Sequence, residues 1–279
     1  MTLFLNFRTR SVGGAVNPNP QLYDGLGDRV QLGWSLIAPS QLRASFAGKS
    51  VLFAVHGFNV TQSSGAVAMG LLDNYLALTA PDLFVGVLWP GDSVIPIVDY
   101  PFEGSVAIDC GRRLADFCND VCGSAQAISF VSHSLGARLI LEAVSRLNRK
   151  ARSVCLTAAA VNRDCLTSEY ANAARNSEQI SILASREDLV LKLAYAVGDP
   201  LAELLHDDHT PFQAALGSEG PPTPAPVQVR APWQIRDAGE DGDFGHSDYL
   251  PPSSPAKWPR VADFMKRAFR DQPQVWPTP

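Results

Sequence analysis

The sequence predicts an α/β fold in which a mostly parallel central sheet is covered by helices on both faces. Two observations predict it: strand-like and helix-like segments alternate along the chain, and the central strand-like segments are almost wholly apolar. A third concerns the start of the chain, where segments 3–7 and 29–37 alternate apolar and polar residues, as half-exposed strands do. We therefore expect a mixed sheet, with antiparallel edge strands formed by residues 1–49.

The predicted elements follow in chain order. After the two edge strands, strands are expected at 50–55, 83–88, 127–131, 154–159, 179–184 and 227–230. Helices are expected at 63–78, 104–122, 135–148, 166–174, 189–205 and 259–270. Alternation of this kind indicates parallel strands joined by crossover helices. The segment 221–232 is rich in proline, but too little chain follows it for a second domain, so we predict one domain over 1–279.

The composition fits a folded protein and disfavours several classes of partner. Hydrophobic residues make up 46% of the chain and charged residues 18%, which permits a sizeable core. The net charge is -5 and no cluster of Lys and Arg occurs, so nucleic acid is not an expected partner. The apolar stretches are too short to span a bilayer, and the N-terminus lacks a secretory pattern. We predict a cytoplasmic protein without a membrane span; nothing in the composition predicts an oligomeric state.

The five cysteines favour reduced thiols. Their number is odd and no Cys-x-x-Cys pair occurs, which is typical neither of a disulfide framework nor of a zinc site. We expect them to be mostly buried.

The most informative run is ISFVSHSLGARL at 128–139, where a buried strand passes directly into a helix. Between the two lies small-x-Ser-x-Gly, the pattern of a nucleophile elbow, with Ser132 in place of the first Gly. Gly136 lets helix and strand approach closely. We predict Ser134 as a nucleophile. The N-terminus of the helix directs free N–H groups at the site, so the Leu135 N–H is predicted as an oxyanion donor.

A second segment, V-H-G-F-N at 55–59, follows the first buried strand. Together with S-H-S-L-G at 132–136 it resembles the α/β-hydrolase superfamily of esterases and lipases, and within it an uncharacterised bacterial esterase-like branch. The element order is similar from about residue 50 to 270 and only loosely before that. The resemblance implies an α/β-hydrolase fold and a second oxyanion donor, the N–H of Phe58. A simple turn with a core histidine is the other interpretation of this segment.

The resemblance also implies a base. In this fold the acid lies between the serine and the histidine in chain order, which excludes His56 and His133. His246 follows the last predicted strand and precedes the closing helix, where the superfamily carries its base. His206 and His209, in L-H-D-D-H, could be metal ligands, but a solvated helix end is the simpler interpretation, and we predict no metal site.

The acid is predicted as Asp188, which comes shortly after the strand expected at 179–184. Sites in α/β proteins form at the carboxyl ends of parallel strands. Family position favours Asp188 over Glu187; Asp164 is the reserve, and Asp243 is interpreted as a solvated loop residue. Asp188 also opens the next predicted helix, so an N-cap is its other possible role.

These residues predict a serine hydrolase that cleaves small-molecule carboxylic esters through an acyl-enzyme, without a cofactor. The alternatives are an amidase or acyltransferase with the same residues, and a non-catalytic hydrolase-like binding module. Segments 92–103 and 199–226 contain proline and apolar residues and are candidate lid loops, although ordinary surface loops are the simpler interpretation.

Overall fold

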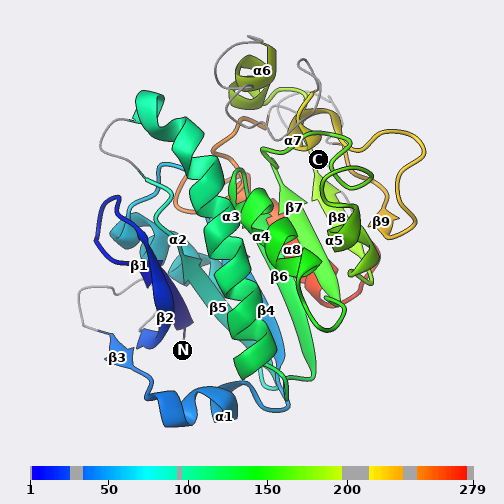
Figure 1. The fold of residues 1–279 in the computed structure, drawn as a ribbon. Coiled ribbons are helices and arrows are strands. Elements are labelled where there is room, and N and C mark those ends of the chain that lie inside the picture. The colour runs from blue at the N-terminus through cyan, green and yellow to red at the C-terminus, as the bar shows by residue number, and fades with distance from the viewer. Residues whose placement is uncertain (1, 26–33, 93–95, 197–213, 235–243, 275–279) are drawn as a thin grey trace.

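The computed structural model describes residues 2–25, 34–92, 96–196, 214–234 and 244–274 (Figure 1). Within these residues one sheet of nine strands has the order β3-β2-β1-β5-β4-β6-β7-β8-β9. The strands are β1 (Thr2–Arg8), β2 (Val16–Gly25), β3 (Ser35–Leu36), β4 (Ser50–Val55), β5 (Asp82–Leu88), β6 (Ala127–His133), β7 (Ser153–Thr157), β8 (Ile180–Leu183) and β9 (Val229–Arg230). From β1 to β9 all neighbouring pairs are parallel, whereas β2 pairs antiparallel with both β1 and β3. The predicted mixed sheet with an antiparallel edge is confirmed.

Helices cover both faces of the sheet (Figure 1). They are α1 (Leu42–Phe46), α2 (Gln62–Leu76), α3 (Pro96–Val121), α4 (Gly136–Ser145), α5 (Ala171–Arg175), α6 (Leu189–Ala196), α7 (Leu216–Glu219) and α8 (Trp258–Phe269), with a 3₁₀ turn at Pro39–Gln41. Helices α3, α4 and α5 pack on one face, and α2 and α8 pack on the other. This is the architecture of the α/β-hydrolase fold.

Strand β4 shows why the central strands read as continuous apolar runs. All six of its residues are buried. Val51, Phe53 and Val55 join the hydrophobic cluster on one face, and Leu52 and Ala54 join the cluster on the other. Each large side chain buried in this way contributes about 1.5–3 kcal/mol to folding. Burial on both faces removes the alternation that half-exposed strands show.

The antiparallel edge differs in detail from the prediction. Most of the predicted strand 29–37 lies outside the described residues, and its last part contains β3. Strand β2 was not predicted, because Pro18 and Pro20 and several polar side chains interrupt its pattern. The pairing of β1 with β2 shifts register between Asn6 and Arg8. Such an irregularity tolerates prolines, which cannot donate to a regular ladder.

Four other predicted segments need correction or fall partly outside the described part. Residues 96–103, predicted as part of a lid loop, form the first turns of α3. Of the other candidate lid, 214–226 is described and contains α7, whereas 199–213 is not. The helix predicted at 166–174 is the shorter α5, and the one predicted at 189–205 is described only to Ala196.

Two further observations concern the whole described chain. No helix in its described parts is both long and apolar enough to cross a bilayer. All five cysteines are described, and they are buried and free, as predicted. Burial raises the pKa of the Cys155 and Cys165 thiols, so both are held in the neutral form.

Candidate active site

Ser134 stands in a sharp turn between β6 and α4. Its φ of 54° lies in the left-handed region, which costs a non-glycine residue of the order of 1 kcal/mol or more. Two backbone hydrogen bonds hold this conformation: the Ser134 N–H donates to the Thr157 carbonyl (3.0 Å), and the Ala160 N–H donates to the Ser134 carbonyl (3.2 Å). The turn that follows β7 therefore fixes the elbow that follows β6.

Gly136 and Gly57 allow this turn to meet the turn after β4. A Cβ at position 136 would lie 2.6 Å from the His56 carbonyl oxygen, closer than real side chains approach. A Cβ at position 57 would lie 2.8 Å from His133 Nδ1 and 3.0 Å from the Ser134 Cβ. Glycine at both positions thus brings the 56–60 turn against the serine.

The structure brings Ser134, His246 and Asp188 into one line of hydrogen bonds. His246 Nε2 is 2.8 Å from Ser134 Oγ, and His246 Nδ1 is 2.8 Å from Asp188 Oδ2. The carboxylate can only accept, so Nδ1 carries the hydrogen of the neutral ring and Nε2 is free to accept the serine proton. The three side chains come from the turn after β6, the loop after β8 and the segment before α8.

Asp188 makes the contacts that both of its possible roles require. Its Oδ2 faces His246, while its Oδ1 accepts the Leu191 N–H at 3.0 Å, in the first turn of α6. The side chain is fully buried. One carboxylate therefore contacts the imidazole and caps a helix, each with a different oxygen.

Of the alternative acids, the two that the structure describes lie elsewhere than beside His246 Nδ1, which faces Asp188. Glu187 is exposed, and Asp164 lies in a turn after β7. Asp243, His206 and His209 lie outside the described residues. The described ranges hold no group of three or more His, Cys, Asp or Glu arranged to bind a metal ion.

The His133 side chain forms a hydrogen bond with the main chain of His246, a contact that the sequence did not predict. Its Nε2 is 2.8 Å from the His246 carbonyl oxygen and must donate to it, and the two rings lie 4.9 Å apart. Burial, followed by the nearby charge of His246, lowers the pKa of His133 to about 3. His133 is thus a neutral, fixed neighbour. The only sequence signal for it is its place beside the predicted nucleophile.

The two predicted oxyanion donors belong to the two turns that meet at the serine. Leu135 is the N-cap residue of α4, so its N–H has no acceptor within the helix. Phe58 follows Gly57 in the turn packed against Ser134. His56, in the same turn, donates Nδ1–H to the Gly57 carbonyl (2.9 Å), and burial lowers its pKa to about 3. His56 therefore stabilises the turn, as a neutral core histidine.

A cavity of about 700 Å³ opens over Ser134. Besides the residues already described, it is lined by Asn59, Val60, Ser64, Ala68, Val190, Leu191, Ser247, Leu250, Pro251, Pro252 and Ser253. Among the described lining residues there is no Lys, Arg, Asp or Glu. Such a wall suits an uncharged, largely apolar ligand.

Comparison with known proteins identifies the family of the chain. The model of a family described as "Alpha/beta hydrolase of unknown function (DUF900)" matches residues 40–224, a segment that contains Phe58, Ser134 and Asp188 and ends before His246. No curated protein matches. Among solved structures, the chain is similar to one titled an acetylxylan esterase, with a TM-score of 0.39 and 10% identity over 80% of this chain and 96% of that one. Because the family model covers more than half of its length, the chain belongs to this family of alpha/beta hydrolases.

Proposed function

We propose that this hydrolase cleaves carboxylic esters, with Ser134 as nucleophile, His246 as general base and Asp188 as the acid that orients the imidazole. The observation that carries the proposal is the pair of 2.8 Å hydrogen bonds that joins the three side chains. A serine hydroxyl is a weak nucleophile without such a base. The left-handed turn at Ser134, which sets the nucleophile at the cavity wall, adds to the support.

The proposed reaction has two halves. His246 Nε2 takes the hydroxyl proton as Ser134 Oγ attacks the ester carbonyl, and the N–H groups of Phe58 and Leu135 stabilise the oxyanion. The imidazolium, stabilised by the Asp188 carboxylate, then protonates the leaving alcohol. Water, activated by the same imidazole, attacks the acyl-enzyme and releases the acid. These steps use only side chains, main-chain N–H groups and water, so we propose no cofactor.

The substrate class follows from the cavity. Its wall includes Val190, Leu191, Leu250 and Pro251, which are apolar. A charged substrate group would lose its hydration there without gaining an ion pair from the described lining residues. We propose a small, uncharged ester with an apolar acyl or alcohol part. The single domain over 1–279 and the location in the cytoplasm stay predictions.

Two alternatives remain within reach of experiment. An amidase or acyltransferase would use the same side chains and is recognised by acyl transfer to an added amine or alcohol. A non-catalytic binding module is disfavoured, because Ser134, His246 and Asp188 keep mutual hydrogen bonds that a pure binding site does not require.

Covalent labelling tests the proposal. A fluorophosphonate should label wild-type protein on Ser134, found by peptide mass spectrometry, and the protein should hydrolyse a short p-nitrophenyl ester. Ser134→Ala should lose both the label and the hydrolysis. Ser132→Ala is the matched control, since Ser132 is equally buried two residues away and should stay active. Retained turnover in folded Ser134→Ala would sink the assignment.

A further inference from the structure

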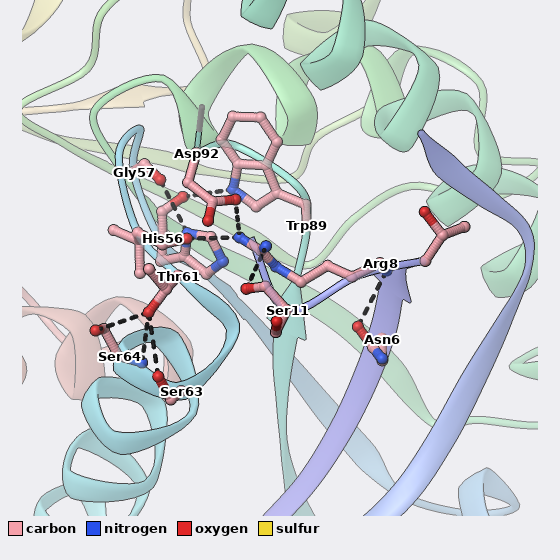
Figure 2. A network of polar contacts seen from close by, with 12 residues as sticks. Asn6, Arg8, Ser11, His56, Gly57, Thr61, Ser63, Ser64, Trp89 and Asp92 are labelled. Carbon is pink, nitrogen blue, oxygen red and sulfur yellow. Dashed lines mark hydrogen bonds and ion pairs between the residues drawn. The ribbon is translucent and has the colours of Figure 1, made fainter. Parts of the chain in front are cut away.

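A buried ion pair lies beside the 56–60 turn (Figure 2). Arg8 Nη2 is 2.5 Å from Asp92 Oδ1, and the two side chains are 0% and 2% exposed. The pairs of Arg112 with Glu142, Arg113 with Asp109 and Arg230 with Asp271 differ from it, because each of their side chains is at least 14% exposed. Removing two charges from water costs free energy that their attraction often does not repay. Stability alone therefore does not explain an ion pair at this position.

The topology explains how these residues meet. Strands β1, β5, β4 and β6 are consecutive neighbours and parallel, so their carboxyl ends share one edge of the sheet. Arg8 ends β1, Asp92 follows β5, the 56–60 turn follows β4, and Ser134 follows β6. The long Arg8 side chain crosses the end of β5 to reach the turn that lies beside the serine.

Arg8 binds the turn directly. Its Nη2 donates to the Val60 carbonyl at 2.6 Å as well as to Asp92, and its Nη1 donates to the Ser11 carbonyl at 3.3 Å. Only a planar guanidinium presents several donors in fixed directions to such a set of acceptors. Asp92 neutralises the buried cation and fixes its orientation.

Other contacts hold the remainder of the turn (Figure 2). Trp89 Nε1 donates to the His56 carbonyl at 2.9 Å, and the two rings stack with centroids 5.8 Å apart. The Asn59 N–H donates to the Gly91 carbonyl at 2.6 Å. Hydrogen bonds therefore hold the backbone on both sides of Phe58, at His56 and at Asn59. Arg8 holds the last residue of the turn, Val60.

We propose that Arg8 and Asp92 are positioning residues for the 56–60 turn, which carries the proposed oxyanion donor Phe58. This inference rests on the proposed function. By holding the Val60 carbonyl, the pair sets the direction of the Phe58 N–H toward the oxyanion. Neither residue lines the cavity, so neither contacts the substrate. A shifted N–H weakens binding of the transition state more than binding of the substrate. Loss of the pair should therefore lower kcat and leave KM nearly unchanged.

The test removes the pair while keeping the volume. Breaking one partner leaves a buried charge alone and destabilises, whereas apolar replacement of both is often neutral. The double variant Arg8→Met with Asp92→Leu should keep a melting temperature near wild type and lose kcat by roughly 10- to 100-fold, less than the 10²–10³ for a deleted oxyanion donor. The rate of fluorophosphonate labelling should fall in parallel. The matched control replaces the partly exposed pair Arg113 and Asp109 in the same way and should change neither quantity.

A second variant keeps the test decisive if the double variant does not fold. Arg8→Lys retains the charge pair but offers one nitrogen in place of the fork, so kcat should fall to an intermediate value with KM within about twofold of wild type. Wild-type kcat in either folded variant, or a rise in KM alone, would overturn the inference. Wild-type protein that neither takes the label nor hydrolyses an ester would instead overturn the proposed function.

Discussion

Replacing Asp188 by Asn separates the two roles of this buried carboxylate. The amide oxygen can occupy the Oδ1 position and still accept the Leu191 N–H, now 3.0 Å from the carboxylate. The amide nitrogen then faces His246 Nδ1, in place of an oxygen 2.8 Å away. An NH₂ group donates, so it favours the imidazole tautomer with hydrogen on Nε2, which cannot take the serine proton.

The expected magnitudes follow from these contacts. Asn caps helices about as well as Asp, so the free energy of unfolding should change by less than about 1 kcal/mol. The wrong tautomer and the unbalanced imidazolium should lower kcat by up to roughly 10⁴-fold, which corresponds to about 5.4 kcal/mol. Turning the amide around to restore the tautomer would place its NH₂ against the Leu191 N–H and leave a buried donor unpaired, at about 1–3 kcal/mol.

The assay is steady-state hydrolysis of a p-nitrophenyl ester beside denaturant unfolding. Glu187→Gln and Asp164→Asn serve as controls and should keep wild-type kcat. If Asp188→Asn is folded and fully active, Asp188 is only a helix cap; if Asp164→Asn is then inactive, the acid is Asp164.

Three further predictions concern the scaffold of the site. Gly136→Ala should lower both kcat and stability, because its Cβ would lie 2.6 Å from the His56 carbonyl oxygen. Ester hydrolysis and denaturant unfolding measure the two effects, and wild-type values would contradict the close packing. His56 and His133 have folded-state pKa values of about 3, below the unfolded value near 6.5, so the stability they confer is present above pH 6.5 and is lost as the pH falls toward 3. For each histidine, the free energy of unfolding should fall by about 2 kcal/mol between neutral pH and pH 5. A His133→Gln variant should therefore show a shallower decline in denaturation midpoints with pH. Thr61→Ala removes the side chain that accepts the Ser64 N–H at the start of α2 and should cost about 1 kcal/mol in unfolding while hydrolysis persists; an unchanged midpoint would argue against the cap.

The central elements could be predicted because local rules decide them. Strand β4 is buried on both faces, and the elbow at Ser134 has a short pattern that reflects steric needs of a single turn. Strand β2 could not be predicted in this way, since an irregular register rather than an apolar pattern accommodates its prolines.

The residues of the site likewise include some that the sequence predicts and some whose contacts it does not. The resemblance, together with chain order and position, predicted His246 and Asp188, and the structure brings His246 to Ser134 and Asp188 to His246. The ion pair of Arg8 with Asp92 joins residues 84 positions apart that share no local pattern. The hydrogen bond from His133 to the His246 carbonyl likewise depends on folding and not on spacing. Long-range polar contacts of this kind become visible only when the strand order is known.

In the proposed mechanism, the cap on α6 ties substrate selection to proton transfer. The oxygen of Asp188 that does not face His246 holds the first turn of this helix, and Val190 and Leu191 from the same turn line the cavity. A ligand too bulky for this wall would push on the turn and, through it, on the Asp188 carboxylate, which we propose orients the base. Efforts to widen the cavity at positions 190 and 191 should therefore alter turnover together with substrate range.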